Sequence, residues 1–209
     1  LARNSFMLQQ GKFVADLAYL LDEGAPSTMP IWGTGLNPAP PEGYDFDYIN
    51  ADVLINRISV SPEGRLILPD GMSYTLLVLP NTSRMTLPVL KKISELVKAG
   101  ATVLGTRPER TPGYSGYPDS EKVFKALVTE TWGDLDGVSK TTRVYGKGKV
   151  FWGTPVKTAL LMSGVQPDFE FGKTLDSKIN WIHRKNTDAD FYFIVNSSDN
   201  QLETELRFR

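Results

Sequence analysis

The chain has 209 residues, and its 23 basic against 24 acidic side chains give a formal net charge of −1. This balance argues against nucleic acid as the main partner and against a polybasic membrane anchor, because both need a surplus of positive charge, and no apolar run is long enough to span a bilayer. The absence of cysteine and the presence of one histidine exclude disulfides, thiolate metal sites, cysteine nucleophiles and sites that need several histidines.

The two ends of the chain carry patterns that continue up to the termini. Residues 1–11 have the composition of a helix that Gly11 ends, and residues 202–208 alternate apolar and polar side chains as a strand does. We therefore expect the chain to be a segment of a longer protein, with residues 1–11 as the tail of a preceding helix. A mature protein with trimmed tails is the alternative.

Residues up to about 174 alternate predicted strands and helices. A buried strand over residues 13–21 leads into a proline- and glycine-rich loop over 24–43, and a helix with Asp47 as a candidate N-cap is expected over 47–58. Further strands are expected at 58–60, 65–68, 74–79, 101–104, 143–145 and 149–152, and further helices at 86–100, 120–132 and 154–164.

The segment 74–104 has the pattern of strand, helix, glycine and strand, a βαβ unit that requires parallel strands. Leu77 is expected at the centre of this sheet, buried from both sides. We predict an α/β domain over residues 1–174 with a doubly wound, mainly parallel sheet, of the flavodoxin-like or class I glutamine amidotransferase-like kind. Residues 175–209 have three strand patterns and no helix, which predicts antiparallel strands that begin a β-sandwich domain.

Ligands of doubly wound folds bind at the carboxyl ends of the strands. Asp22 and Glu23 follow the first strand and would repel a phosphate, and no glycine-rich phosphate motif follows any strand. Thr82 and Ser83 follow the strand 74–79, where amidotransferase-like folds hold a nucleophile. No glycine flanks Ser83 as a sharp nucleophile elbow requires, so a capping loop is favoured there.

Residues 43–52 form the densest cluster of aromatic and polar side chains. In one interpretation the aromatic rings stack on a sugar while Asp45, Asp47, Tyr48 and Asn50 bind its hydroxyl groups. In the other, Asp45 or Asp47 caps the following helix and the aromatic residues pack the loop. His183 lies beside Trp181 on a predicted strand, which favours a packed structural histidine over a ligand or domain-interface role.

Short segments spread over nearly the whole chain share their sequence with one known family. They cover residues 1–5, 8–12, 43–52, 66–74, 79–80, 85–93, 164–169 and 182–185. In this combination the chain resembles glycoside hydrolase family 106, the α-L-rhamnosidases. The resemblance implies a large bacterial enzyme, secreted or periplasmic, with a catalytic barrel, then an amidotransferase-like α/β domain, then β-sandwich modules.

The resemblance also implies where the chemistry lies. The catalytic carboxylates and the calcium-dependent sugar site of such enzymes belong to the barrel upstream of Leu1, so no catalytic residue, cofactor or metal ligand is expected in this chain. The loop 24–43 would rest on that barrel. Five residues are candidates for the rim of its sugar site, namely Asp45, Asp47, Tyr48, Asn50 and His183.

Three functions follow from these observations. The first is a non-catalytic accessory domain whose partners are the upstream barrel and the downstream β-sandwich of the same polypeptide, in an enzyme that acts on plant glycans. The second is a free-standing amidotransferase-like hydrolase, and the third is a carbohydrate-binding module built on the aromatic cluster.

Overall fold

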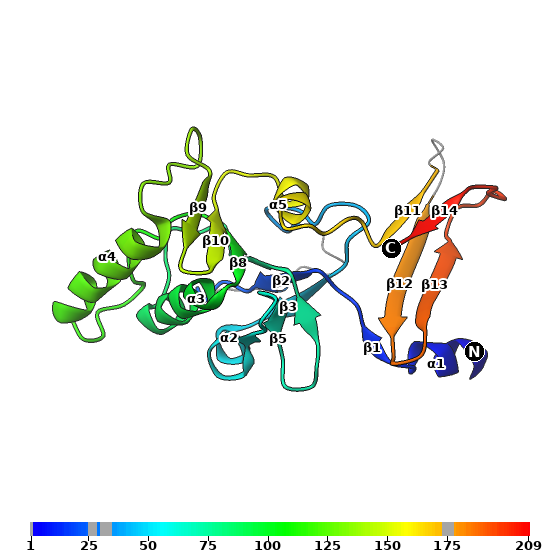
Figure 1. Ribbon diagram of the computed structural model, residues 1–209, viewed down its shortest axis with the longest axis horizontal. Coiled ribbons are helices and arrows are strands. Elements are labelled where there is room, and N and C mark those ends of the chain that lie inside the picture. Colours follow the sequence, from blue (N-terminus) through cyan, green and yellow to red (C-terminus); the bar gives the residue numbers. More distant parts are fainter. Residues whose placement is uncertain (1, 25–28, 30–34, 173–177) are drawn as a thin grey trace.

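The structure is a computed structural model that describes residues 2–24, 29, 35–172 and 178–209. Figure 1 shows two parts side by side, with the α/β elements on the left and a smaller β-rich part on the right, where both termini lie. None of the helices in the described ranges is long and apolar enough to cross a membrane.

A six-stranded sheet forms the centre of the α/β part. Its strands, in spatial order, are β3 (Phe46–Ile49), β2 (Leu17–Leu20), β7 (Leu76–Val78), β8 (Thr102–Leu104), β10 (Gly148–Phe151) and β9 (Thr142–Tyr145). All neighbouring pairs are parallel except β10 and β9. The expected mainly parallel sheet is therefore confirmed, and so is the position of Leu77, which is 0% exposed on a strand between two others.

Helices cover both faces of this sheet because its strands are apolar on both sides. In β2, Ala18 and Leu20 belong to the core under α2 (Ala51–Arg57), α3 (Leu87–Ala99) and α4 (Asp119–Trp132). Leu17 and Tyr19 point the other way, into the core under α5 (Val156–Met162). In Figure 1, α5 lies above the sheet and α2 and α3 lie below it.

Two expected strands are divided in the structure. The segment 13–21 forms β1 (Lys12–Phe13) and β2, because the chain bends at Asp16, whose carbonyl accepts the N–H groups of Thr75 and Leu76 at 2.8 and 3.0 Å. The segment 74–79 is divided at Thr75 into β6 (Ser73–Tyr74) and β7. Strand β6 belongs to a small antiparallel sheet with β4 (Ser59–Val60) and β5 (Leu66–Ile67).

The β-rich part contains α1 (Ala2–Leu8) and two antiparallel sheets. One sheet has the order β1, β12 (Ile179–Lys185), β13 (Asp190–Asn196), and the other pairs β11 (Phe169–Phe171) with β14 (Leu206–Phe208). Aromatic rings join the sheets, with centroids 5.3 Å apart for Phe169 and Trp181 and 4.6 Å apart for Tyr192 and Phe208. The expected antiparallel arrangement is confirmed, while a domain boundary at residue 174 stays a prediction.

The helix expected from Asp47 begins later. Residues 46–49 form the edge strand β3, and α2 starts at Ala51 after the N-cap Asn50, whose Oδ1 accepts the N–H of Val53 at 2.9 Å. The prediction that Asp47 caps this helix is therefore wrong, because a residue inside a strand cannot cap a helix that starts four residues later. In the loop 24–43, residues 25–28 and 30–34 lie outside the described ranges, and Leu36 packs against the core under α5.

Candidate functional site

The five candidate rim residues do not gather at one place. Asp47 and Tyr48 are neighbours on β3, so their side chains point to opposite faces of the sheet. The Oδ2 atom of Asp47 accepts the hydroxyl of Tyr74 at 2.8 Å, while Tyr48 packs with the core under α5. Asn50 caps α2 at the carboxyl end of β3. The proposed role of each of these residues at the rim of a barrel therefore stays a prediction, and each residue has to be tested separately.

Asp45 precedes β3 at the amino end of the sheet. Burial raises the pKa of Asp45 to about 6, helped by the negative charges of Asp47, Asp168 and Asp16, although the N–H of Phe46 donates to its carboxylate at 2.9 Å. The half-buried carboxyl group therefore holds its proton to a higher pH than an exposed aspartate does.

The loops at the carboxyl end of the sheet are hydrogen-bonded to one another and to the start of α3. Eight residues separate β7 from α3, so Thr82 and Ser83 stand on a loop without the sharp elbow of a nucleophile. The carbonyl of Ser83 accepts the N–H of Glu109 at 2.8 Å, which joins this loop to the one after β8. The carboxylate of Glu23 binds the N–H and hydroxyl of Thr86 at the start of α3, at 3.0 and 2.8 Å.

A cleft of about 750 Å³ opens beside α4 at this end, and Asn81, Thr82, Ser83, Arg107 and Trp152 are among its lining residues. The chain's one histidine is His183 on β12, which is bonded to Asp168 near the opposite end of the sheet. No imidazole therefore lies beside the hydroxyl groups of this cleft. These hydroxyls therefore lack the imidazole that usually activates a serine or threonine nucleophile, although Glu109 also lines the cleft.

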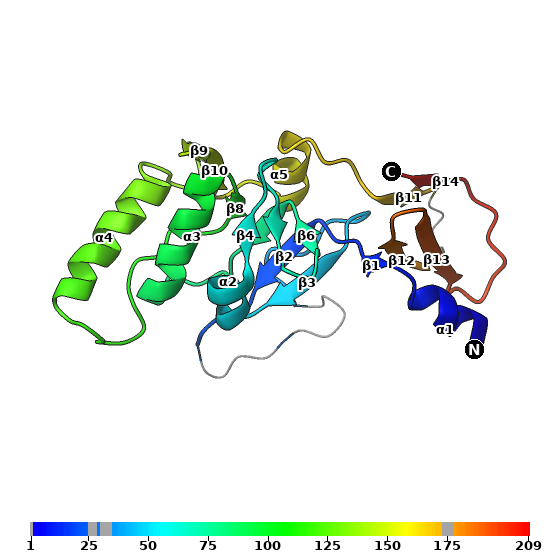
Figure 2. The same cartoon turned by 60° about the horizontal axis from the view of Figure 1, so that its bottom comes forward.

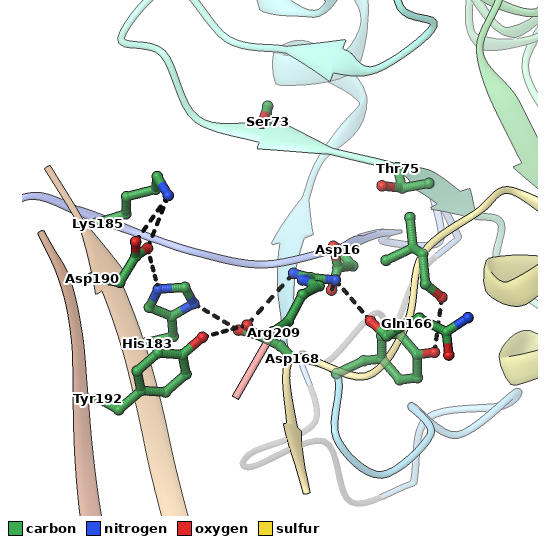
Figure 3. A network of polar contacts seen from close by, with 12 residues as sticks. Asp16, Ser73, Thr75, Gln166, Asp168, His183, Lys185, Asp190, Tyr192 and Arg209 are labelled. Atoms are coloured by element: carbon green, nitrogen blue, oxygen red, sulfur yellow. Dashed lines mark hydrogen bonds and ion pairs between the residues drawn. The ribbon is translucent and has the colours of Figure 1, made fainter. Parts of the chain in front are cut away.

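A buried cluster of charged residues occupies the amino end of the sheet, where the α/β part meets the β-rich part (Figure 3). Asp16 and Asp168 are 2% and 1% exposed. The guanidinium of Arg209 lies 3.0 Å from Asp16 Oδ2 and 3.6 Å from Asp168 Oδ1, and it donates to the carbonyl of Gln166 at 2.9 Å. The chain segments before β2, before β11 and after β14 are thereby tied together.

His183 stands between two carboxylates in this cluster. Its Nδ1 lies 2.8 Å from Asp168 Oδ2 and its Nε2 lies 2.9 Å from Asp190 Oδ1, and its ring stacks on Tyr192 with centroids 4.0 Å apart. Burial by itself lowers the pKa of His183, but the hydrogen bonds to Asp168 and Asp190 outweigh it, so the pKa is raised above 6.5. Both ring nitrogens donate in the protonated form, which fits two carboxylate acceptors.

The remaining contacts complete the cluster. Asp168 Oδ1 accepts the hydroxyl of Tyr192 at 2.8 Å, and Lys185 pairs with Asp190 at 3.0 Å. Burial raises the pKa of Asp16, and Arg209 opposes that shift. We interpret the cluster as a joint between the two parts, because its charged groups come from both and are bound to one another.

Sequence reasoning singled out only one member of this cluster, His183, and favoured a packed structural histidine over a ligand or domain-interface role, a choice that stays a prediction. It missed Asp16, Asp168, Tyr192 and Arg209. The available signal was Asp16, the one charge in the apolar run 13–21, since an unpaired charge is rarely buried. Within the described ranges no three acidic or histidine side chains lie in a geometry that would hold a metal ion.

Comparison with known proteins places these observations in a family. The family model described as alpha-L-rhamnosidase, glycoside hydrolase family 106, matches residues 1–209. A Formosa agariphila protein named as a beta-glucuronidase is 32% identical over 211 residues, which cover 100% of this chain and 16% of that protein.

A solved structure of a rhamnosidase from Novosphingobium sp. PP1Y is also similar. It shares 31% sequence identity with a TM-score of 0.86, and the match covers 100% of this chain and 19% of the solved one. The chain thus spans less than a fifth of the length of either relative. Since the family model matches from the first residue to the last, the chain belongs to glycoside hydrolase family 106, the alpha-L-rhamnosidases.

Proposed function

We propose that the chain is a non-catalytic accessory part of a larger bacterial glycoside hydrolase that acts on α-L-rhamnosides of plant glycans. In this role it joins an upstream catalytic barrel to a downstream β-sandwich of the same polypeptide. The small share of each relative that the chain covers supports such a position within a multidomain protein.

The observation that carries the proposal is the position of His183. The chain has no cysteine and no other histidine, and both nitrogens of this ring are bound to carboxylates. A free-standing amidotransferase-like hydrolase would need an activated nucleophile at the carboxyl end of the sheet, where Thr82 and Ser83 stand on a plain loop.

We also propose a flavodoxin-like fold for the α/β part and a secreted or periplasmic location for the protein. The five parallel strands β2, β3, β7, β8 and β10, numbered one to five in chain order, are arranged 2-1-3-4-5, the order of flavodoxin-like sheets. This order supports a flavodoxin-like, amidotransferase-like α/β domain. A secreted or periplasmic location is proposed from family membership alone, and fractionation of the source bacterium would test it.

The catalytic part of the proposal is tested by assaying the 209-residue chain and the full-length protein with an aryl α-L-rhamnoside, and the chain with glutamine. We expect turnover by the full-length protein and none by the chain above the buffer blank. Turnover by the chain that Ser83→Ala or Asn81→Ala abolishes, while the exposed control Ser139→Ala does not, would refute the accessory role.

A further inference from the structure

A groove of about 1,020 Å³ separates the start of β3 from β12 at the amino end of the sheet. Tyr44, Asp45 and Phe46 form one wall, Trp181 and its neighbours on β12 form the other, and Phe13 of β1 also lines it. The structure thus adds two aromatic residues, distant in sequence, to the aromatic and polar cluster 43–52.

The aromatic side chains of the groove are held in place by contacts outside it. The hydroxyl of Tyr44 donates to the carbonyl of Val165 at 3.1 Å. Phe46 meets the ring of Tyr19 edge to face at 5.5 Å, and Trp181 packs on Phe169 at 5.3 Å. A ligand would therefore meet preformed apolar surfaces and would lose little affinity to ordering them.

The open edge of β12 supplies directed polar groups. Strand β1 pairs only with Arg184 and Lys185, and the chain then leaves after Val14, whose N–H donates to the carbonyl of His183 at 3.0 Å. Backbone groups of an antiparallel strand alternate between its two neighbours. The N–H and C=O of Ile179 and Trp181 therefore point to the same side as those of His183, where no strand of the described ranges pairs with them.

Side chains add further acceptors and set the charge of the groove. Asp45 keeps one carboxylate oxygen beyond its bond to Phe46, and the Nδ2 of Asn180 donates to Ser197 at 2.8 Å, which leaves its Oδ1 as an acceptor. The lining includes the acidic residue Asp45 and no lysine or arginine. A ligand with a carboxylate or sulfate would be repelled.

We propose that this groove is a binding site for a neutral pyranose unit of a glycan. Apolar C–H faces of the sugar pack on Phe46 and Trp181, and its hydroxyl groups bind Asp45, Asn180 and the free edge of β12. Aromatic walls with a few directed polar groups are the usual lining of a small-ligand site. The site is separate from the accessory role proposed above, which does not require the chain to bind sugar.

The test is a nuclear magnetic resonance titration of the 209-residue chain with L-rhamnose, D-glucose and D-glucuronate. We expect saturable shifts at residues 45–46 and 179–182 with a neutral sugar and weaker binding of glucuronate. Asp45→Asn, which preserves shape, should weaken neutral-sugar binding about tenfold, the effect of one hydrogen bond to a charged group. Trp181→Ala should abolish it.

The control is Trp152→Ala, which removes a half-buried tryptophan from the other cleft and should leave sugar affinity unchanged. Thermal unfolding of each variant shows that it is folded, and Trp181→Phe replaces Trp181→Ala if that variant is not. The absence of saturable shifts with both neutral sugars, or glucuronate binding as tight as that of glucose, would overturn the proposal. Burial of the Trp181 indole in the sugar-free full-length protein would also overturn it, because a polypeptide segment would then fill the groove.

Discussion

Replacing Asp168 with asparagine tests whether the buried charged cluster holds the two parts of the molecule together. The carboxylate is 1% exposed and accepts from His183 and Tyr192, each at 2.8 Å, while Arg209 lies 3.6 Å away. Asparagine places an amide NH₂ where one of these donors points and removes the charge that Arg209 faces. We expect the free energy of unfolding to fall by about 3–5 kcal/mol, the usual cost of breaking a buried charge pair.

The matched control is Asp190→Asn, which removes the other carboxylate bound to His183. The side chain of Asp190 is 41% exposed and is also paired with Lys185, so solvent screens its contribution and we expect a loss below about 1 kcal/mol. Urea unfolding followed by tryptophan fluorescence measures both variants. Equal losses, or a loss below about 1 kcal/mol for Asp168→Asn, would refute the assignment of the cluster as a joint.

The loss of unfolding free energy caused by Asp168→Asn should depend on pH, and the pKa of His183 sets the direction of the change. The pKa of His183 is raised in the folded state, so its contribution is complete below the unfolded value of about 6.5 and is lost as the pH rises through the folded value. The loss caused by Asp168→Asn should therefore be larger at pH 6.5 than at pH 9. A loss that stays constant over this window would contradict a charged His183. Asp168, Asp190 and Tyr192 contact this ring, and the two carboxylates are contacted in turn by Arg209 and Lys185.

Three further predictions concern stability and use the same urea assay. Leu77→Ala should cost about 2–5 kcal/mol because the side chain is fully buried between two layers of helices, and a loss within about 0.5 kcal/mol would mean that its site collapses without a cavity. Asn50→Ala should cost about 1 kcal/mol as the loss of a helix cap, a value that Asp52→Ala in the first turn of α2 should not reach. Gly153→Ala should be strongly destabilising, because Gly153 has φ 76° and the new Cβ would meet the carbonyl of Gly137; Gly35→Ala, at φ 83° with open space, is its control.

Elements with complete local signals could be predicted from the sequence. The helix α3 has Thr86 before its start, Pro88 in its first turn and Gly100 after its end, and the structure places it at Leu87–Ala99. The apolar strand patterns before and after α3 also predicted that β7 and β8 are parallel, because a strand–helix–strand unit joins parallel strands. Such elements are specified by residues within one turn of their own ends, so no distant contact is needed to locate them.

The strand β3 and the charged cluster could not be predicted in the same way. Asp47 resembled a cap because an acidic residue preceded an apolar helical face, and only the pairing of β3 with β2 makes residues 46–49 a strand. The cluster joins Asp16, Asp168, His183 and Arg209 from four separate segments. Periodicity tells which face of an element is buried but not which distant segment covers it.

The buried charges and the aromatic groove lie at the end of the central sheet opposite to the usual ligand edge. Doubly wound folds bind ligands at the carboxyl ends of their strands, but here Glu23 fills the positive start of α3 and hydrogen bonds join the loops after β7 and β8. The buried charges and the aromatic groove both lie at the amino end, where the β-rich part meets the sheet. The attached β strands supply most of the charged cluster, including His183, and one wall of the groove, including Trp181. Both features therefore lie where a second part of the molecule adds side chains to the α/β scaffold, and neither could be located from the pattern of the sheet alone.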